Sequence, residues 1–424
     1  MNDLIIHGRN IALAIQDGRI TAAAPTLAES AKQEIDARHA LVLPGWIDAH
    51  VHFNEPGRTS WEGIATGSRA LAAGGGTAYF DMPLNSSPPV ITRAALEGKR
   101  RLAEEKSCID FALWGGLTPD SLDHMEAMAH AGAIGFKAFM CPSGIAEFQD
   151  ATPSTLRKGM QISARLGLPV AVHAEDPEVI WQHQLDYPPK SNDMRAWLDS
   201  RPIAAELSAI CIAIDLAGET GCHLHIVHVS CPEGIEIVTA AKKQGVRVTV
   251  ETCPHYLLLD DYAAIRIGPA AKCAPPLRSH ETLTALWQKL LAGEIDTIGS
   301  DHSPSSPDLK QGTDFFAIWG GIAGIQHALP LLLGHSHEIL AQLTANVAHH
   351  FRLAGKGTLL PGNDADFVIV NQQPSIISKE SLFTRHPISP YLEMHSAYTI
   401  AATYLRGTQV GDHTRGKFLK PTQL

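Results

Sequence analysis

The hydrophobic pattern of the first two dozen residues is that of short β-strands separated by turns. Apolar runs at residues 4–6 and 11–15 precede Asp17-Gly18-Arg19, a sequence typical of a hairpin turn. Near the other end of the chain, residues 367–370 and 398–405 are again predicted strands. Because no helical pattern separates the strands within either segment, we expect residues 1–43 and 351–424 to combine in one small β-sandwich.

Between these segments the pattern changes to a regular alternation of strands and helices. Longer stretches with helical spacing of apolar residues lie at 63–73, 94–106, 155–166, 201–217, 234–244 and 283–292. The eight predicted strands are residues 45–51, 77–82, 109–115, 134–140, 169–173, 223–229, 247–251 and 296–300. Eight β–α units predict an α/β fold, a (β/α)8 TIM barrel over residues 44–350. The alternative, a doubly wound sheet, is disfavoured because no GxGxxG motif follows the first strand.

Composition narrows the class of function. The 424 residues carry a formal net charge of -10 and no long Lys/Arg run, which disfavours nucleic acid and anionic membranes as partners. We find no apolar run long enough for a membrane helix and no signal-peptide pattern. The 7 cysteines form no CxxC pair and suit reduced thiols, so we expect a cytoplasmic protein. Histidine, with 22 residues, is unusually frequent, and it is the commonest metal ligand.

The strongest chemical signal is Asp48-Ala49-His50-Val51-His52, at the end of the first predicted barrel strand. Residues two apart on a strand face the same side, so both imidazoles are expected to point into the mouth of the barrel. Two histidines held in this way make half a metal site.

Further candidate ligands follow other predicted strands. His173 closes strand five, His228 closes strand six and Asp301 follows strand eight. Barrel enzymes place their catalytic groups at these C-terminal strand ends. On strand six, His223 and His225 compete with His228, which is favoured because it lies nearest the strand end. For His255, after strand seven, a structural role is favoured over a role beside the site.

Lys137 lies in the fourth predicted strand between two phenylalanines. A bare cation is costly in such a buried position. Either the side chain reaches solvent or pairs with Asp301 or Glu175, or its neutral amine adds CO2 to give a carbamate. A carbamate carries one negative charge and two oxygens, so it can bridge two cations.

The order HxH, Lys, His, His, Asp over strands one, four, five, six and eight resembles the amidohydrolase superfamily. More narrowly, it resembles the cyclic amidohydrolases, which include dihydroorotases, hydantoinases and allantoinases. The resemblance implies a homo-oligomer, with a tetramer favoured over a dimer, acting on a small cyclic ureide. It also implies that Lys137 is carbamylated (N6-carboxylysine), and that Asp301 is both a metal ligand and the catalytic proton shuttle. Two divalent cations, Zn2+ favoured over Co2+, Mn2+, Ni2+ or Fe2+, would be held by His50, His52, Lys137, His173, His228 and Asp301.

The loops after the strands bear on the choice of substrate. Dihydroorotases usually carry an arginine where this chain has Asn54; an asparagine suits a neutral ureide, although Arg58 lies close by. Hydantoinases usually carry a tyrosine shortly after the bridging lysine, and residues 140–144 contain none. Four loop segments, at residues 54–63, 81–86, 139–144 and 319–324, resemble the allantoinase branch.

This resemblance implies hydrolysis of the cyclic amide bond of allantoin to allantoate. It nominates Asn85, Ser143, the backbone of Ala274 and Gly321 for substrate binding. A hydantoinase (dihydropyrimidinase) or dihydroorotase-like activity is the alternative. A non-catalytic scaffold is disfavoured because all six ligand positions are filled. The irregular stretch 303–324 is expected to be functional, since compact domains seldom keep long loops otherwise.

Overall fold

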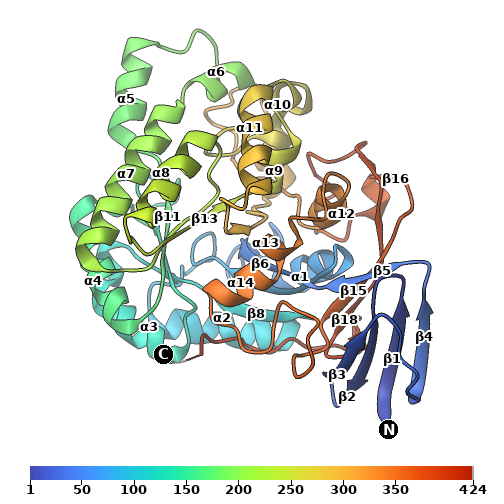
Figure 1. Ribbon diagram of the computed structural model, residues 1–424. Helices are drawn as coiled ribbons and strands as arrows, with labels where there is room; N and C mark the ends of the chain where they lie inside the picture. Colours follow the sequence, from blue (N-terminus) through green and yellow to red (C-terminus); the bar gives the residue numbers. More distant parts are fainter. Residues whose placement is uncertain (423–424) are drawn as a thin grey trace.

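The computed structural model describes residues 1–422. Parallel strands occupy its centre and helices surround them (Figure 1). One sheet has the order β6-β7-β8 and the other β14-β13-β12-β11-β10-β9. The strands are β6 (Trp46–Val51), β7 (Gly76–Asp81), β8 (Asp110–Leu113), β9 (Gly115–Gly116), β10 (Phe136–Phe139), β11 (Val170–His173), β12 (Leu224–Ile226), β13 (Val248–Thr252) and β14 (Thr297–Ile298).

The two sheets continue into each other. Only Trp114 separates β8 from β9. At the other edge, Val51 forms a parallel bridge with His302, and the His52 amide donates to the His302 carbonyl at 2.8 Å. The first strand of the series therefore lies beside the segment that follows the last one. Each of the eight strands predicted from the sequence overlaps an observed strand.

Local sequence explains where some of the helices begin and end. In α4, the hydroxyl of Thr152 accepts from the Thr155 amide at 3.2 Å, and Gly167 ends the helix in the left-handed region. The helices are α1 (Ile64–Ala73), α2 (Arg93–Lys106), α3 (Met125–Ala131), α4 (Pro153–Leu166), α5 (Pro177–Asp186), α6 (Met194–Asp199), α7 (Ile203–Thr220), α8 (Pro232–Lys243), α9 (Pro254–Leu258), α10 (Asp261–Ile267), α11 (His280–Leu291), α12 (Ala328–Leu333), α13 (Leu340–Leu343) and α14 (Ala345–His350). Across residues 1–422, none of them combines the length and apolarity that crossing a bilayer requires.

Two four-stranded sheets lie at one side of the parallel strands (Figure 1). Their orders are β3-β2-β1-β4 and β19-β18-β15-β5, so the second sheet joins strands from both ends of the chain. Ile6 and Leu13 of the first sheet share a buried core with Val42 and Phe367 of the second. Their strands, with the short pair β16 and β17, are β1 (Asn2–Gly8), β2 (Ala12–Gln16), β3 (Arg19–Ala24), β4 (Ala31–Ala37), β5 (Leu41–Pro44), β15 (Phe367–Asn371), β16 (Ser375–Ile376), β17 (His395–Ser396), β18 (Thr399–Leu405) and β19 (Thr408–Gln409).

A buried ion cluster connects these sheets to the parallel strands. The Nζ of Lys356 lies 2.6 Å from Asp110, 2.9 Å from Asp364 and 2.6 Å from Asp366. Arg406 pairs with Asp110 as well, at 2.7 Å. Asp110 opens β8, whereas the other members belong to the C-terminal segment. We call these five residues the junction cluster.

The C-terminal segment also extends beyond the two terminal sheets. The amide of Phe111 donates to Lys417, and the amide of Leu419 donates back to Phe111. Residues 417–419 thus run along β8, away from the rest of their segment.

Candidate active site

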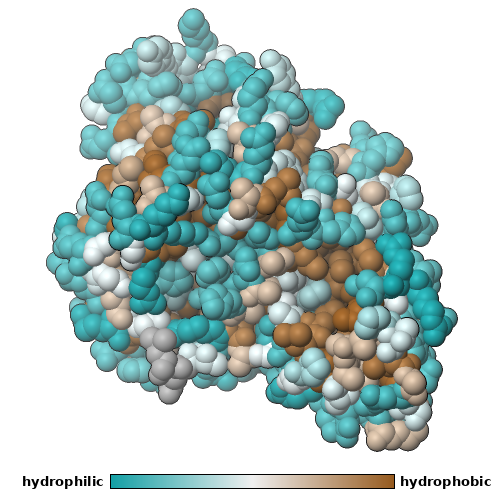
Figure 2. All heavy atoms as spheres, viewed as in Figure 1, coloured by the Kyte–Doolittle hydropathy of each residue, from teal (hydrophilic) through white to brown (hydrophobic). Residues whose placement is uncertain are grey.

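A hollow of about 390 Å³ opens beyond the C-terminal ends of the parallel strands. It is lined by His50, His52, His173, His228 and Asp301 together with loop residues. Two larger hollows, of about 960 and 1150 Å³, lie elsewhere. The first is lined by residues of α1, α12 and β18, on a face where Figure 2 shows apolar side chains gathering. Only the smallest of the three is lined by predicted ligand residues, and it has five of the six; Lys137 is not among its lining residues.

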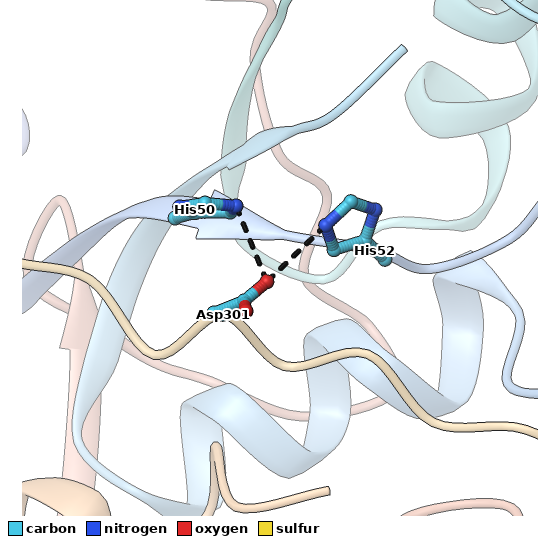
Figure 3. Close-up of side chains that lie close together, drawn as sticks. All are labelled: His50, His52 and Asp301. Atoms are coloured by element: carbon cyan, nitrogen blue, oxygen red, sulfur yellow. Dashed lines mark ion pairs between the residues drawn. The ribbon is translucent and has the colours of Figure 1, made fainter. Parts of the chain in front are cut away.

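His50 and His52 meet Asp301 at one point of this hollow (Figure 3). The Nε2 atoms of His50 and His52 lie 3.2 and 3.3 Å from the same Asp301 oxygen. Although burial alone would raise the pKa of Asp301, the His50 and His52 imidazoles hold it well below its usual range. Asp301 is therefore a carboxylate at neutral pH, with its charge directed at the two histidines.

His173 and His228 lie next to this trio. The ring of His228 is 5.6 Å from that of His50 and 4.6 Å from that of His173. Burial lowers the pKa of both residues, so both imidazoles are neutral. The competing His225 lies deeper, against Phe351 at 5.4 Å, and bonds Thr249 at 2.8 Å. His223 also bonds Thr249, at 3.1 Å.

Two buried carboxylates orient the histidines from behind. Glu251, at the end of β13, lies 2.7 Å from His50 Nδ1. Burial alone would raise the pKa of Glu251, but His50 and His225 lower it to about 2. Glu175 lies 2.8 Å from His173 Nε2 and is held in turn by Arg201. A carboxylate on the far nitrogen fixes the orientation of an imidazole and raises its basicity toward a cation.

Lys137 is fully buried, and its amine has no hydrogen-bond partner among residues 1–422. It lies 5.2 Å from the centre of the Phe139 ring, and no described carboxylate comes within ion-pair distance. The two sequence-based pairings, with Asp301 or Glu175, are therefore not formed. Burial lowers the pKa of Lys137 to about 8, which raises the fraction of neutral amine at physiological pH.

Three residues at the hollow have strained backbones. His228, Asp301 and Asn85 adopt φ values of 44°, 45° and 63°, in the left-handed region. This region is uncommon for residues other than glycine and costs of the order of 1–3 kcal/mol. Such strain at residues facing one cavity is typical of functional sites.

The four residues nominated for substrate binding, Asn85, Ser143, Ala274 and Gly321, all line the hollow. Two of them are already engaged: the Ser143 hydroxyl donates to the Phe148 carbonyl at 2.6 Å, and the Gly321 amide donates to Lys272 at 2.7 Å.

Asn54, expected near the substrate, lies elsewhere. It is fully buried and donates to the Pro304 carbonyl at 3.0 Å, so it supports the 303–324 loop. Arg58, its suggested substitute, faces Glu147 at 3.6 Å. His255 is buried against Tyr256, with no hydrogen-bond partner among the described residues.

Sequence reasoning missed Glu251, Arg201 and Lys272, all of which lie at or behind the hollow. The position of Glu251 at the end of a predicted strand, Thr249-Val250-Glu251, was the available signal. The sequence around Arg201 and Lys272 contains no motif that marks either residue. Only the folded chain shows what the two side chains contact.

The donor set suits divalent first-row cations. Neutral imidazoles and a carboxylate are the ligands that Zn2+ and its neighbours bind. The buried His228 Nδ1 and Lys137 Nζ lack partners among the described residues, which fits groups awaiting a ligand.

Comparison with known proteins gives a consistent result. The amidohydrolase family model matches residues 41–410. The chain is 48% identical to the allantoinase of Solibacter usitatus, covering 96% of this chain and 93% of that protein. It is also 48% identical to the allantoinase of Rubrobacter xylanophilus, covering 99% and 98%. Among solved structures, the L-hydantoinase (dihydropyrimidinase) from Arthrobacter aurescens has a TM-score of 0.94 at 31% identity, covering 99% of this chain and 100% of that one. The chain therefore belongs to the amidohydrolase family.

Proposed function

We propose that the protein is an allantoinase, which hydrolyses the cyclic amide bond of allantoin to give allantoate. The observation that carries this proposal is the match to proteins named allantoinase at 46–48% identity over nearly the whole chain. The hydantoinase structures resemble the chain in fold, but at 31% identity or less. Hydantoin hydrolysis is the second candidate activity because the L-hydantoinase has a TM-score of 0.94.

The proposal includes the architecture. Strands β6 to β14 form a closed (β/α)8 barrel, supported by the bridge between Val51 and His302. We propose that residues 1–43 and 351–424 supply the strands of the accompanying β-sandwich domain, with residues 417–419 running along β8 outside its two sheets. We further propose that the protein is a cytoplasmic homo-oligomer. Its seven cysteines are free thiols, which supports a reducing compartment.

Two divalent cations, with Zn2+ favoured, are proposed to be held by His50, His52, Lys137, His173, His228 and Asp301. When bound, such cations lower the pKa of a coordinated water and polarise a carbonyl oxygen. Lys137 takes part as its carbamate: the neutral amine forms a C–N bond to CO2 and releases one proton. The modification replaces an unpaired buried amine by an anion, whose charge the two cations would balance.

Asp301 is the proposed catalytic acid and base. It accepts the proton of the attacking water and then delivers that proton to the ring nitrogen as the amide C–N bond breaks. This delivery is needed because an amide nitrogen leaves poorly without a proton. His50 and His52, held 3.2–3.3 Å from the carboxylate, orient it. Asn85 and the Ala274 backbone are proposed to position the ring, whereas Ser143 and Gly321, whose hydroxyl and amide are engaged within the loops, are proposed to shape the wall against which it lies.

One preparation tests the proposal. Metal content and turnover of allantoin, hydantoin and dihydroorotate are measured on the same sample. We expect about two metals per chain and the highest kcat/KM for allantoin, with loss of activity after verified metal removal. A higher kcat/KM for hydantoin would instead favour the second candidate. Unchanged turnover without metal would overturn the metal-dependent chemistry.

A further inference from the structure

One lysine in the hollow has no place in the chemistry described so far. Lys272 lines the hollow although its side chain is almost completely buried, with 3% of its surface exposed. Its ammonium donates to the Ile318 carbonyl and lies 4.0 Å from the centre of the Trp197 ring. Among residues 1–422, no carboxylate lies within ion-pair distance of it. A buried cation without an anionic partner retains donors for a ligand.

Most other polar groups around the hollow are already engaged. Arg201 binds both oxygens of Glu175, and Trp197 Nε1 donates to the Cys273 carbonyl. The Ser143 hydroxyl and the Gly321 amide are used within the loops, as described above. An ammonium offers three donors, and Lys272 spends one of them on Ile318. Lys272 is therefore the strongest hydrogen-bond donor still available to a bound molecule.

The proposed substrate has a group that needs such a donor. Allantoin is a hydantoin ring that carries a ureido group, and its ring amide must lie at the histidine cluster. The ureido carbonyl then needs a hydrogen-bond donor from elsewhere in the hollow. Hydantoin has the same ring without this group.

We propose that Lys272 is a specificity-determining residue that donates a hydrogen bond to the ureido carbonyl of the substrate. This assignment rests on the proposed function. It explains how the predicted ligand cluster, in a fold that the chain shares with an L-hydantoinase, is directed toward a ureido-substituted ring.

Lys272 also supports the 303–324 loop, and the test must separate the two roles. Its backbone carbonyl accepts from Gly321, and its ammonium holds Ile318. Lys310 is a matched control because it supports the same loop, donating to Gly321 at 2.8 Å and to Pro269 at 3.3 Å. Unlike Lys272, Lys310 does not line the hollow.

The experiment compares Lys272→Met, Lys272→Arg and Lys310→Met with the parent protein, each checked for folding by its urea midpoint. Hydantoin is measured both as a substrate and as a competitive inhibitor of allantoin hydrolysis. Its binding can then be compared with that of allantoin even if the protein hydrolyses hydantoin slowly. We expect Lys272→Met to lower kcat/KM for allantoin about 10- to 100-fold, mainly through KM, as loss of a charged hydrogen bond predicts. Its kcat/KM and inhibition constant for hydantoin stay near those of the parent. Lys272→Arg retains most of the preference for allantoin over hydantoin, and Lys310→Met weakens the binding of allantoin and hydantoin by the same factor.

A second measurement needs no substitution. On the parent protein, 5-acetamidohydantoin keeps the carbonyl and should approach allantoin in KM, whereas 5-propylhydantoin lacks it and should not. The assignment is overturned if Lys272→Met leaves the preference for allantoin over hydantoin unchanged, or if the two analogues have equal KM. A parent that opens allantoin but gives either result overturns the role of Lys272 alone, whereas a parent that opens no cyclic amide overturns the proposed function.

Discussion

Buried lysines are treated differently in two regions of the molecule. In the junction cluster, Lys356 lies within 2.9 Å of three carboxylates. Burial alone would lower its pKa, but Asp110 and Asp366 raise it above the ordinary value. At the hollow, Lys137 and Lys272 have no carboxylate partner within ion-pair distance among the described residues, and burial lowers the pKa of each to about 8.

The difference teaches how to distinguish a structural charge from a functional one. A buried ion that is neutralised by its neighbours joins elements and needs nothing more. A buried ion that is left unbalanced reduces stability, and the fold keeps it where a ligand or a modification supplies the missing charge or acceptor.

The largest expected effect is at the hollow. Asp301→Asn should lower kcat at least about 100-fold, because an amide cannot move the proton. Asparagine tolerates the left-handed backbone that Asp301 adopts, so the fold should be preserved. Steady-state kinetics and urea unfolding of the same sample measure the two quantities. Near-native turnover would show that another group moves the proton.

Next in size is the junction cluster. Lys356→Met leaves buried carboxylates without their cation and should lower the free energy of unfolding by about 3–5 kcal/mol, with kcat of the folded fraction unchanged. Lys32→Met is the matched control: Lys32 also pairs with an aspartate at 2.8 Å, but it is largely exposed, and its loss should have no measurable effect. Equal stability of the two variants would remove the distinction between the regions.

A smaller effect is expected behind the histidines. Glu251→Gln replaces the carboxylate that holds His50 and should weaken metal binding about 10- to 100-fold. Competition with a chelator of known affinity measures this. Glu206→Gln is the control, since Glu206 is an equally buried glutamate that holds Ser230 and Arg278 instead. Similar metal affinities for the two variants would contradict the orienting role of Glu251.

The effect that is smallest at each measured step concerns pH. Burial, together with the Lys272 ammonium, lowers the pKa of Lys310 to about 7. In the unfolded chain a lysine titrates near 10.4, so between pH 7 and 10 the unfolded chain binds a proton that the folded chain has released. The free energy of unfolding of the parent, minus that of Lys310→Met, should therefore rise with pH in this window, by at most about 1.4 kcal/mol per pH unit.

Lys356, with its raised pKa, provides the contrast. Its stabilising contribution is fully present below the unfolded value near 10.4 and is lost only as pH rises through its folded pKa. The parent minus Lys356→Met difference should stay level from pH 7 to 10. Urea titrations at pH 7, 8, 9 and 10 measure both differences in the free energy of unfolding. If the parent minus Lys310→Met difference fell as pH rises, the pKa of Lys310 would be raised by folding and not lowered.

Much of the region of parallel strands was predictable because its signals are local. The strand at Val170–His173 is a short apolar run, and α4 carries its own start and stop residues. The side chains that converge on the hollow were found because parallel strands end on one side. His50 and Asp301 are a clear case: they are far apart in sequence, yet strand order alone predicts that they are neighbours.

What escaped prediction depends on partners distant in sequence. Asn54 was expected near the substrate, but its contact with Pro304 is made only when two loops meet. Glu251 and Arg201 acquire their roles from His50 and Glu175, which no local pattern connects to them. Short helices such as α6 and α10 lie inside long connections, where six or seven residues carry too little periodicity to be recognised.

The pairing of β5 with β15 has a consequence for how the chain is made. β5 leads directly into the first parallel strand, yet its antiparallel partner is translated only after the last of them. During synthesis the sheet β1–β4 can form early, while the edge of β5 stays open until almost the whole chain has left the ribosome. Nascent chains that stall before β15 therefore expose an unpaired strand, and they should be the species most prone to aggregate.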